Sequence, residues 1–501
     1  MKTCRNPGTS WWVPHGLGVA VVVLGAAGFA VLAVAGVAAA AEGRPNVLLI
    51  CVDDLRPELG CYGCEHIKSP NIDRLAREGR RFTRHYVEVA VCGPSRCSLL
   101  TGTRVHGSWD VWGPARRLER EPERPVSFAQ LFRRAGYRTV SIGKVSHEPG
   151  GTMPPAYEVH QVPFSWDVAV GPTGAWKTPW AAFFGYAGGS AYNAVVRWVK
   201  DQPPRMPFEG ADVPDHGYPD ALNADLAVEQ LRDLTERDGP FLLAVGFFKP
   251  HLPHNAPKKY WDLYPPEVVG MAEFGRPPEN VDPAISLHNS FEPTTHYHWP
   301  SGPGVFSRDE AVRQRRAYFA CVSYTDAQIG RVLDEYRRLG LDESTIVVLW
   351  ADHGWHLGDY GIFGKATNFE RATRSPLIVK LPDMPKPGEP ADGLAETVDV
   401  YPTLADLCDL KPPEGLAGTS LRPMLEDPAH PGKAAARSFF RRGQLDGNAL
   451  RTDRYRLVQW RHRKTGRVAQ IEIYDHRADP GETRNVAAEQ PEVVEKLLDK
   501  L

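Results

Sequence analysis

The feature that most constrains the fold is a set of continuous apolar, mostly β-branched runs that end in polar residues. The first is NVLLICV (46–52), followed directly by Asp53 and Asp54. Uninterrupted apolar runs of this length are typical of parallel strands that are buried on both faces. Similar runs are RTVSIGK (138–144), FLLAVGFFK (241–249), TIVVLWADH (345–353) and PLIVKL (376–381).

Helical patterns separate these runs. Strands that alternate with helices predict an α/β fold, in which a large, mostly parallel sheet carries helices on both faces. In such folds ligands bind outside the carboxyl ends of the strands, where the polar residues gather. The helical patterns begin near 71, 127, 221 and 310, and the last continues to 339.

The remaining segments differ in character. Two stretches rich in Gly, Pro, Trp and His, 149–220 and 252–308, are long enough to be functional loops. The tail reads as an antiparallel hairpin followed by one helix. We expect a catalytic domain over 44–430 and a small C-terminal antiparallel subdomain over 438–501, joined by a Pro-rich stretch near 423–431.

The N-terminus has the layout of an export signal. Lys2 and Arg5 precede an apolar run over 17–37 and a small-residue AAAAEG segment, which predicts a signal peptide over 1–41. The run is also long enough to stay as a membrane anchor if it is not cleaved. In both cases the catalytic part is exported, to the periplasm or the extracellular space.

Charge and cysteine content exclude some classes. The formal net charge is -2, which gives no electrostatic footprint for nucleic acid. The eight cysteines are too sparse for a disulfide scaffold. Cys61 and Cys64 form a single C-x-x-C, which favours a loop with two thiols or a local disulfide over a metal site.

Two pairs of candidate ligands follow predicted strands, Asp53-Asp54 and Asp352-His353. Each pair alone is equally compatible with helix capping or with solvated charges. If the two strands are neighbours, however, the pairs converge and offer several ligands to a hard divalent cation.

The stretch CGPSRCSLLTG (92–102) combines a thiol with a predicted helix start. Pro94 and Ser95 favour a helix N-terminus just after Cys92, and Arg96 adds a guanidinium fork suited to sulfate or phosphate. From the residues alone, Cys92 is either a buried structural thiol or a thiolate nucleophile.

The same stretch matches C-x-P-S-R-x-x-x-L-T-G at every fixed position, and so resembles the signature of the type I, formylglycine-dependent sulfatases. The blocks DDLRPELGCYG, GKVSH, KPHLP and DHGWHLG are most similar to the iduronate-2-sulfatase group. The resemblance implies an alkaline-phosphatase-like fold. It also implies that a formylglycine-generating enzyme converts Cys92 to Cα-formylglycine, whose hydrated aldehyde is the nucleophile.

The resemblance further implies roles for individual residues. One calcium ion would be bound by Asp53, Asp54, Asp352, His353 and an oxygen of the modified Cys92. Many sulfatases have Asn in place of His353, and an oxygen donor suits calcium better. Arg96, Lys144 and Lys365 would bind sulfate oxygens, His251 would protonate the leaving oxygen with help from Lys365, and His147 would take a proton from the hydrated aldehyde.

Other residues are candidates for the pocket wall or the core. His254, His288, His296 and His298 lie in the second long stretch and are candidates for a substrate groove. Trp355 and His356 follow the second ligand pair and are expected in the pocket wall. Cys97 is expected to be a small buried apolar residue.

The sequence therefore predicts an exported, calcium-dependent sulfatase that removes sulfate from a sulfated carbohydrate, acting at a chain end as the iduronate-2-sulfatase group does. Two alternatives remain. One is a phosphate or phosphonate monoester hydrolase of the same superfamily, because tetrahedral oxyanions resemble one another. The other is a pseudoenzyme that binds sulfated glycans without hydrolysis.

Overall fold

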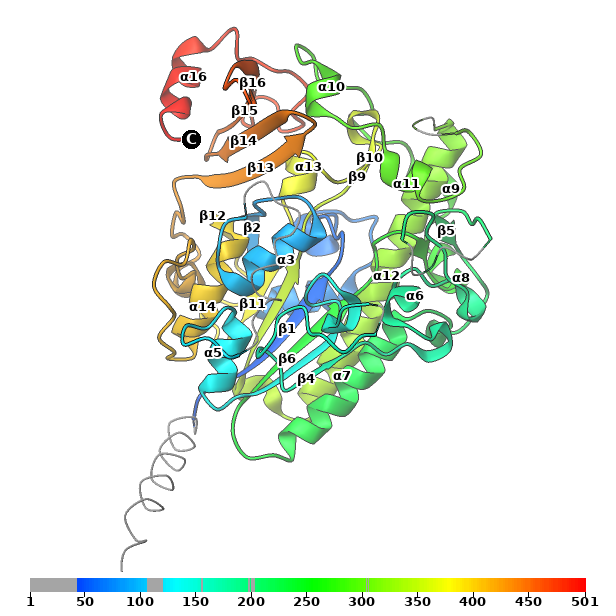
Figure 1. Cartoon of the computed structure of the whole chain (residues 1–501), viewed down its shortest axis with the longest axis vertical. Helices are drawn as coiled ribbons and strands as arrows, with labels where there is room; N and C mark the ends of the chain where they lie inside the picture. Colours follow the sequence, from blue (N-terminus) through cyan, green and yellow to red (C-terminus); the bar gives the residue numbers. More distant parts are fainter. Residues whose placement is uncertain are drawn as a thin grey trace, which may run out of the picture.

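The computed structural model describes residues 43–105, 120–154, 156–196, 199, 203–302, 304 and 306–501 (Figure 1). The predicted signal peptide, 1–41, lies outside the described residues. Within them, no helix is long and apolar enough to cross a membrane.

A large mixed sheet forms the centre of the molecule. Its eight strands lie in the order β12-β2-β11-β8-β1-β6-β3-β4, and all neighbours are parallel except β11, which is antiparallel to both β8 and β2. The strands are β1 (Asn46–Val52), β2 (Arg80–Tyr86), β3 (Arg138–Gly143), β4 (Val168–Val170), β6 (Phe241–Phe247), β8 (Thr345–Ala351), β11 (Leu377–Lys380) and β12 (Ala391–Glu396).

The predicted runs all form strands of this sheet, but one of them runs in the opposite direction. The run at 376–381 gives β11, which is antiparallel. An apolar run indicates burial on both faces and carries no information about direction. The strand β2, RRFTRHY, was not among the predicted runs because charged residues interrupt its apolar positions.

Side chains of the buried strands alternate between two cores. In β1, Leu48, Ile50 and Val52 face one core, and Val47 and Leu49 face the other. Helices on both faces cover these cores, as predicted. The first core is covered by α2 (Pro70–Glu78), α7 (Asp220–Thr235) and α12 (Arg308–Arg338), and the second by α3 (Cys92–Thr101), α5 (Phe128–Arg134), α14 (Val400–Leu407) and α15 (Arg422–Glu426).

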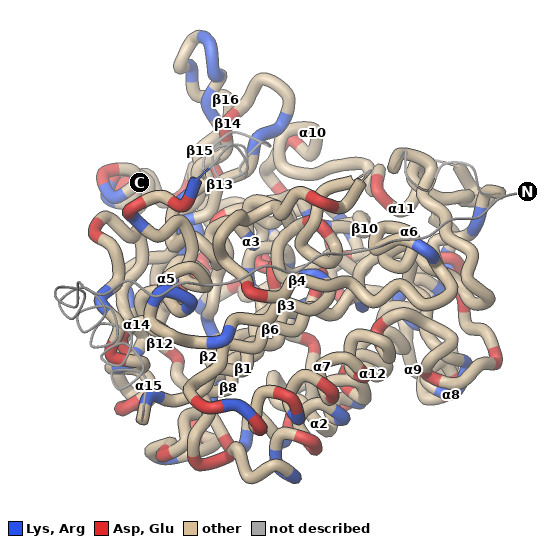
Figure 2. Tube along the Cα trace, turned by 60° about the horizontal axis from the view of Figure 1, so that its bottom comes forward, with Lys and Arg blue, Asp and Glu red and all other residues tan. Residues whose placement is uncertain are grey.

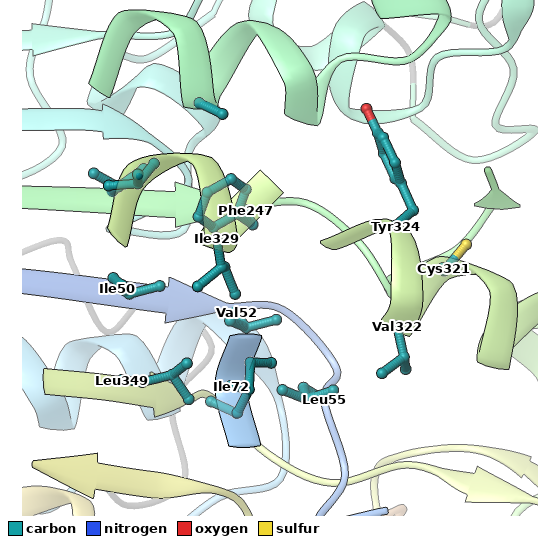
Figure 3. Close-up of a cluster of buried hydrophobic side chains, with 14 of the residues drawn as sticks. Ile50, Val52, Leu55, Ile72, Phe247, Cys321, Val322, Tyr324, Ile329 and Leu349 are labelled. Carbon is teal, nitrogen blue, oxygen red and sulfur yellow. The ribbon is translucent and has the colours of Figure 1, made fainter. Parts of the chain in front are cut away.

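Figure 3 draws part of the first core, in which Val52 of β1, Ile72 of α2 and Ile329 of α12 come together. The long helix α12 starts with a capping box, because the Ser307 side chain accepts from the backbone N–H of Glu310 and the Glu310 carboxylate accepts from that of Ser307. The capping box fixes the first turn of α12, and the buried apolar side chains of the helix pack it against the sheet.

The two long stretches hold short elements near the carboxyl ends of the strands. The first brings together an aromatic cluster that includes Trp176, Trp180, Phe183 and Phe184. The short elements of this region and of the segment after β8 are α6 (Pro179–Phe183), β5 (Phe208–Glu209), β7 (His254–Asn255), α8 (Lys258–Trp261), α9 (Pro266–Val269), α10 (Pro283–Ser286), α11 (Phe291–Thr295), β9 (His356–Leu357), β10 (Phe363–Gly364) and α13 (Glu370–Thr373).

The C-terminal part is a four-stranded antiparallel sheet with one helix beside it (Figure 1). It has two strands more than the predicted hairpin. The elements are β13 (Ala436–Arg442), β14 (Leu445–Arg451), β15 (Tyr455–His462), β16 (Val468–Asp475) and α16 (Pro491–Leu498). The boundaries of the two predicted domains stay a prediction.

The cysteine and charge patterns are also visible in the structure. Cys61 and Cys64 are two unpaired thiols, the first of the two forms that the sequence left open. Cys97 is buried in the second core, as expected. Figure 2 shows acidic and basic residues interspersed along the described chain.

A glycine in β6 permits close approach to the end of β3. Gly246 pairs with Gly143, and its carbonyl accepts a hydrogen bond from the Lys144 N–H at 3.0 Å. A methyl group on Gly246 would overlap the backbone of Lys144. We expect Gly246→Ala to lower the free energy of unfolding by about 1–3 kcal/mol and to lower kcat/KM by about 10- to 100-fold through displacement of Lys144.

Urea unfolding and steady-state kinetics check this prediction. The matched control is Gly275→Ala, whose added methyl would meet only the Ala272 carbonyl, at 3.8 Å. Equal behaviour of the two variants would contradict the close approach.

Candidate active site

The ends of β1 and β8 bring the two predicted ligand pairs together. The strands are parallel neighbours with Val52 opposite Ala351, so Asp53-Asp54 and Asp352-His353 leave the sheet side by side. The backbone N–H of Asp54 donates to Asp352 Oδ1 at 2.9 Å. All four side chains are fully buried.

The helix α3 carries Cys92 to the same place. Cys92 is the first residue of the helix, with Val91 as the N-cap, so the predicted start after Cys92 is wrong. Ser95 does not cap the helix, because its hydroxyl donates to the Asp352 carbonyl at 2.5 Å. The Cys92 Sγ lies 3.4 Å from His353 Nε2, and burial raises the pKa of the thiol well above its usual value.

Arg96 lies one helical turn further on and ties the cluster together. Its Nε donates to Asp352 Oδ2 at 3.0 Å, and a terminal nitrogen lies 3.3 Å from Asp53 Oδ1. The guanidinium also donates to the carbonyl groups of Lys144 and Val145. Arg96 is fully buried behind Cys92 and does not line the cavity described below.

Two lysines from different segments contact the cluster. Lys144 follows β3 and donates to Asp53 Oδ2 at 2.5 Å. Lys365 follows β10 and donates to Asp54 Oδ1 at 2.8 Å and to Cys92 Sγ at 3.3 Å. Burial opposes the charge of Lys365, but the surrounding acidic groups, of which Asp54 contributes most, together outweigh burial and hold the lysine pKa well above its usual value.

The loop that carries Lys365 is held from both sides. The next residue, Ala366, has a left-handed backbone with φ of 64°. Its N–H donates to the Ala90 carbonyl at 3.1 Å, and its carbonyl accepts from Arg442 of the C-terminal sheet at 2.9 Å. This strained residue therefore depends on contacts from both parts of the chain.

The two predicted catalytic histidines also face Cys92 and its neighbours. The His147 ring lies next to Gly93, and burial and Lys144 lower the histidine pKa to about 3. His251 Nδ1 donates to the Leu252 carbonyl at 2.5 Å, which leaves Nε2 3.8 Å from Asp54 Oδ2. Burial, followed by the charge of Lys365, holds the His251 pKa well below its usual value.

The donor set fits a divalent cation. Asp53, Cys92, Asp352 and His353 each offer one ligand atom, and these atoms lie within 4.8 Å of one another. His353 Nδ1 donates to the Gly354 carbonyl at 2.9 Å, so the Nε2 lone pair is free to face the cluster. Burial and the Asp53 charge raise the pKa of Asp352 to about 7, and a bound cation would stabilise its ionised form.

A cavity of about 360 Å³ opens above this cluster. Cys92, Lys144, His147, His251 and Lys365 reach its surface. Among the histidines proposed for a groove, only His296 lines it; His298 is exposed, and His254 and His288 are hydrogen-bonded to the backbone. Trp355 and His356 are fully buried and do not line the cavity.

Several cavity residues were not predicted from the sequence. These residues lie in the two long stretches and the C-terminal sheet, outside any recognisable motif. Only the enrichment of aromatic residues there could have indicated them. They are Trp180, Phe183, Phe184, Asn193, Phe291, Glu292 and Phe440.

The fold and the site define a class of protein. A large sheet with helices on both faces, a small C-terminal antiparallel sheet, and acidic ligands at strand ends beside a helix N-terminus make an alkaline-phosphatase-like hydrolase. Residues 45–410 match the sulfatase family, and residues 358–501 match the family "N-sulphoglucosamine sulphohydrolase, C-terminal". The chain belongs to the sulfatase family and is a sulfuric ester hydrolase.

Individual relatives agree with this membership. The chain is 33% identical to human iduronate 2-sulfatase over 403 residues, which cover 74% of this chain and 70% of the relative. A crystal structure of an Agrobacterium radiobacter phosphonate monoester hydrolase has the same fold, with a TM-score of 0.71 and 24% identity over 91% of this chain and 94% of that one. A protein in complex with its substrate D-glucosamine-2-N,6-O-disulfate has a TM-score of 0.66 and 22% identity over 91% and 97%.

Proposed function

We propose that this hydrolase removes sulfate from a sulfated carbohydrate, with Cys92 carried as Cα-formylglycine and one calcium ion bound by Asp53, Asp54, Asp352, His353 and the modified side chain. The observation that carries the proposal is the meeting of β1, β8 and the first turn of α3 at the base of one cavity. When present, these two groups would supply the nucleophile and the positive charge that polarises it.

The basic residues divide into two groups. Lys144 and Lys365 reach the cavity and would neutralise the sulfate oxygens and the charge that develops during ester cleavage. Arg96 lies behind Cys92, where it would hold Asp53 and Asp352 in place. Its role toward sulfate would therefore be exerted through the carboxylates and the helix.

The two histidines would move protons in opposite directions. His251 Nε2 faces the cavity and would protonate the leaving oxygen from the imidazolium form, because the Nδ1 proton is held by the Leu252 carbonyl; the nearby charge of Lys365 makes that form a stronger acid. His147, whose ring lies next to Gly93, would accept a proton from the side chain at position 92. Within one turnover, His251 would therefore only donate a proton to the substrate and His147 would only accept one.

The size of the cavity favours a single sugar unit. A volume of about 360 Å³ lies at the lower end of the range for small-molecule sites. We therefore infer action at a chain end, and the similarity to human iduronate 2-sulfatase supports a sulfated uronate as a candidate. We also propose export through the N-terminal signal and maturation by a formylglycine-generating enzyme.

Mass spectrometry of the peptide that holds Cys92 tests the modification. We expect an aldehyde or its hydrate in protein from the native host, and an unmodified thiol in active enzyme would sink the proposed nucleophile. Turnover of nitrophenyl sulfate against nitrophenyl phosphate separates the sulfatase from the phosphate and phosphonate alternative. Tight binding of sulfated oligosaccharides without sulfate release would favour the pseudoenzyme.

Removal of the metal is expected to lower stability as well as activity. Dialysis against a chelator should abolish sulfate release, and calcium at a hundredfold excess over its Kd should restore about 2.7 kcal/mol of unfolding free energy. Thermal unfolding with and without calcium checks this. The Asp352→Asn variant should show a much smaller shift, whereas Asp342→Asn, at a partly exposed carboxylate elsewhere, should keep it. An unchanged Tm in the parent protein would contradict the calcium site.

A further inference from the structure

Glu292, on the short helix α11, is the one carboxylate among the described residues that line the cavity. Its side chain is 14% exposed. It lies in the second long stretch, and neither the metal cluster nor the proton transfers described above use it. Its position next to the reacting groups calls for a physical explanation.

The Glu292 carboxylate has unused hydrogen-bonding capacity. Its Oε1 lies 3.4 Å from His251 Nε2 and 3.6 Å from Lys365 Nζ, both longer than the roughly 2.8 Å of a charge-assisted hydrogen bond. No described residue donates a hydrogen bond to this carboxylate. An ionised carboxylate accepts several hydrogen bonds, so the lone pairs of Glu292 are open to a ligand although two basic groups lie within ion-pair distance. A ligand that brings a donor would use this capacity.

The position of the carboxylate indicates which part of a substrate would meet it. The leaving oxygen of the ester is expected at His251 Nε2, and Glu292 lies directly beside that atom. Adjacent substituents of a sugar ring are close enough to engage both groups at once. A sugar whose ester oxygen lies at His251 would therefore bring the adjacent ring substituent within reach of Glu292.

The surrounding walls suit a sugar that carries such a donor. The Phe183 ring lies 4.6 Å from the His251 ring, and Phe184 and Phe291 also line the cavity. Aromatic rings pack against the apolar face of a sugar and attract a cation placed over them. A hydroxyl group, or more strongly an ammonium group, would satisfy both the walls and the carboxylate.

We propose that Glu292 is a specificity-determining residue, which accepts a hydrogen bond from a hydroxyl or ammonium group on the ring carbon next to the sulfate ester. This inference rests on the proposed function, because it needs the ester oxygen at His251. Within the class of sulfated carbohydrates, it selects those with a hydrogen-bond donor beside the ester.

Three sulfated nitrophenyl glycosides test the proposal; they differ only in the group beside the ester, which is hydroxyl, ammonium or hydrogen. We expect kcat/KM of the parent enzyme to be about 10- to 100-fold higher for the first two than for the deoxy ester. In Glu292→Leu both ratios should fall to about one. In Glu292→Gln the hydroxyl preference should partly remain, because the amide oxygen still accepts, and the ammonium preference should fall.

The matched control is Glu267→Leu, at an exposed carboxylate on α9 in the same long stretch, which should keep both ratios. Equal rates for all three esters in the parent enzyme, or unchanged ratios in Glu292→Leu, would overturn the role of Glu292. Failure of the parent enzyme to hydrolyse any ester, nitrophenyl sulfate included, would instead overturn the proposed function together with this inference.

Discussion

Replacement of Cys92 by alanine is expected to lower kcat by about 10⁴-fold or more, because loss of a nucleophile leaves only binding and charge stabilisation. Cys92 is buried at the base of the cavity, within 3.4 Å of His353 Nε2 and 3.3 Å of Lys365 Nζ. Alanine keeps the helix intact and adds no polar group. Sulfate release from nitrophenyl sulfate, measured at saturating substrate, checks the prediction.

The matched control lies on the same helix. Cys97 is buried in the second core, away from the cavity, and Cys97→Ala should keep kcat while it lowers the free energy of unfolding by roughly 1 kcal/mol. If both substitutions reduced kcat equally, damage to α3 would explain the loss better than a role for Cys92. Retention of substantial turnover by Cys92→Ala would contradict the nucleophile directly.

The second large effect is expected on stability. Arg96→Met removes the donor group that contacts Asp53, Asp352 and the carbonyl groups of Lys144 and Val145, all of them buried. Removal of one partner from a buried ion pair costs about 3–5 kcal/mol, because the remaining charge has lost its compensation. Urea unfolding measures this loss, and Arg96→Lys, which keeps the charge without the fork, should fall between the parent and Arg96→Met.

An exposed arginine provides the control. Arg484 pairs with Glu489 at 2.7 Å, but both side chains are about half exposed. Arg484→Met should therefore change the free energy of unfolding by about 0–1 kcal/mol. Similar losses for Arg96→Met and Arg484→Met would show that Arg96 does not hold the carboxylate cluster together.

Much of the fold and the site could be predicted because it depends on short segments of the sequence. The apolar runs marked five strands of the central sheet, and a polar pair at the end of a strand is placed by the strand itself. The proximity of Asp53 to Asp352 needed one further fact, that β1 and β8 are neighbours, which only the structure supplies. The roles of these residues rest on the family resemblance, not on their placement.

Other features depend on contacts between distant segments. The direction of β11 follows from the path of the chain, which its three apolar residues do not encode. Serine is a common helix cap, yet the Ser95 hydroxyl donates to the Asp352 carbonyl instead. Here a contact with a distant segment overrides the local preference. Glu292 and Phe440 reach the cavity from segments without a motif. For the same reason, His296 lines the cavity whereas His254 and His288 bond to the backbone.

The attachment of the Lys365 loop bears on how this enzyme can be shortened or engineered. Arg442 bonds to the Ala366 carbonyl, Asn368 donates to the Gly447 carbonyl, and Arg456 bonds to the Asn368 carbonyl. A chain cut before β13 would lose all of these contacts and would also expose Val89 and Ala366, which pack against the small sheet. Limited proteolysis within the small sheet should therefore inactivate the enzyme as it releases a fragment. The temperature at which catalysis is lost should be set by whichever of the two sheets unfolds first. Stabilising substitutions in the C-terminal strands, at positions other than the cavity residue Phe440, would then extend the working lifetime of the enzyme.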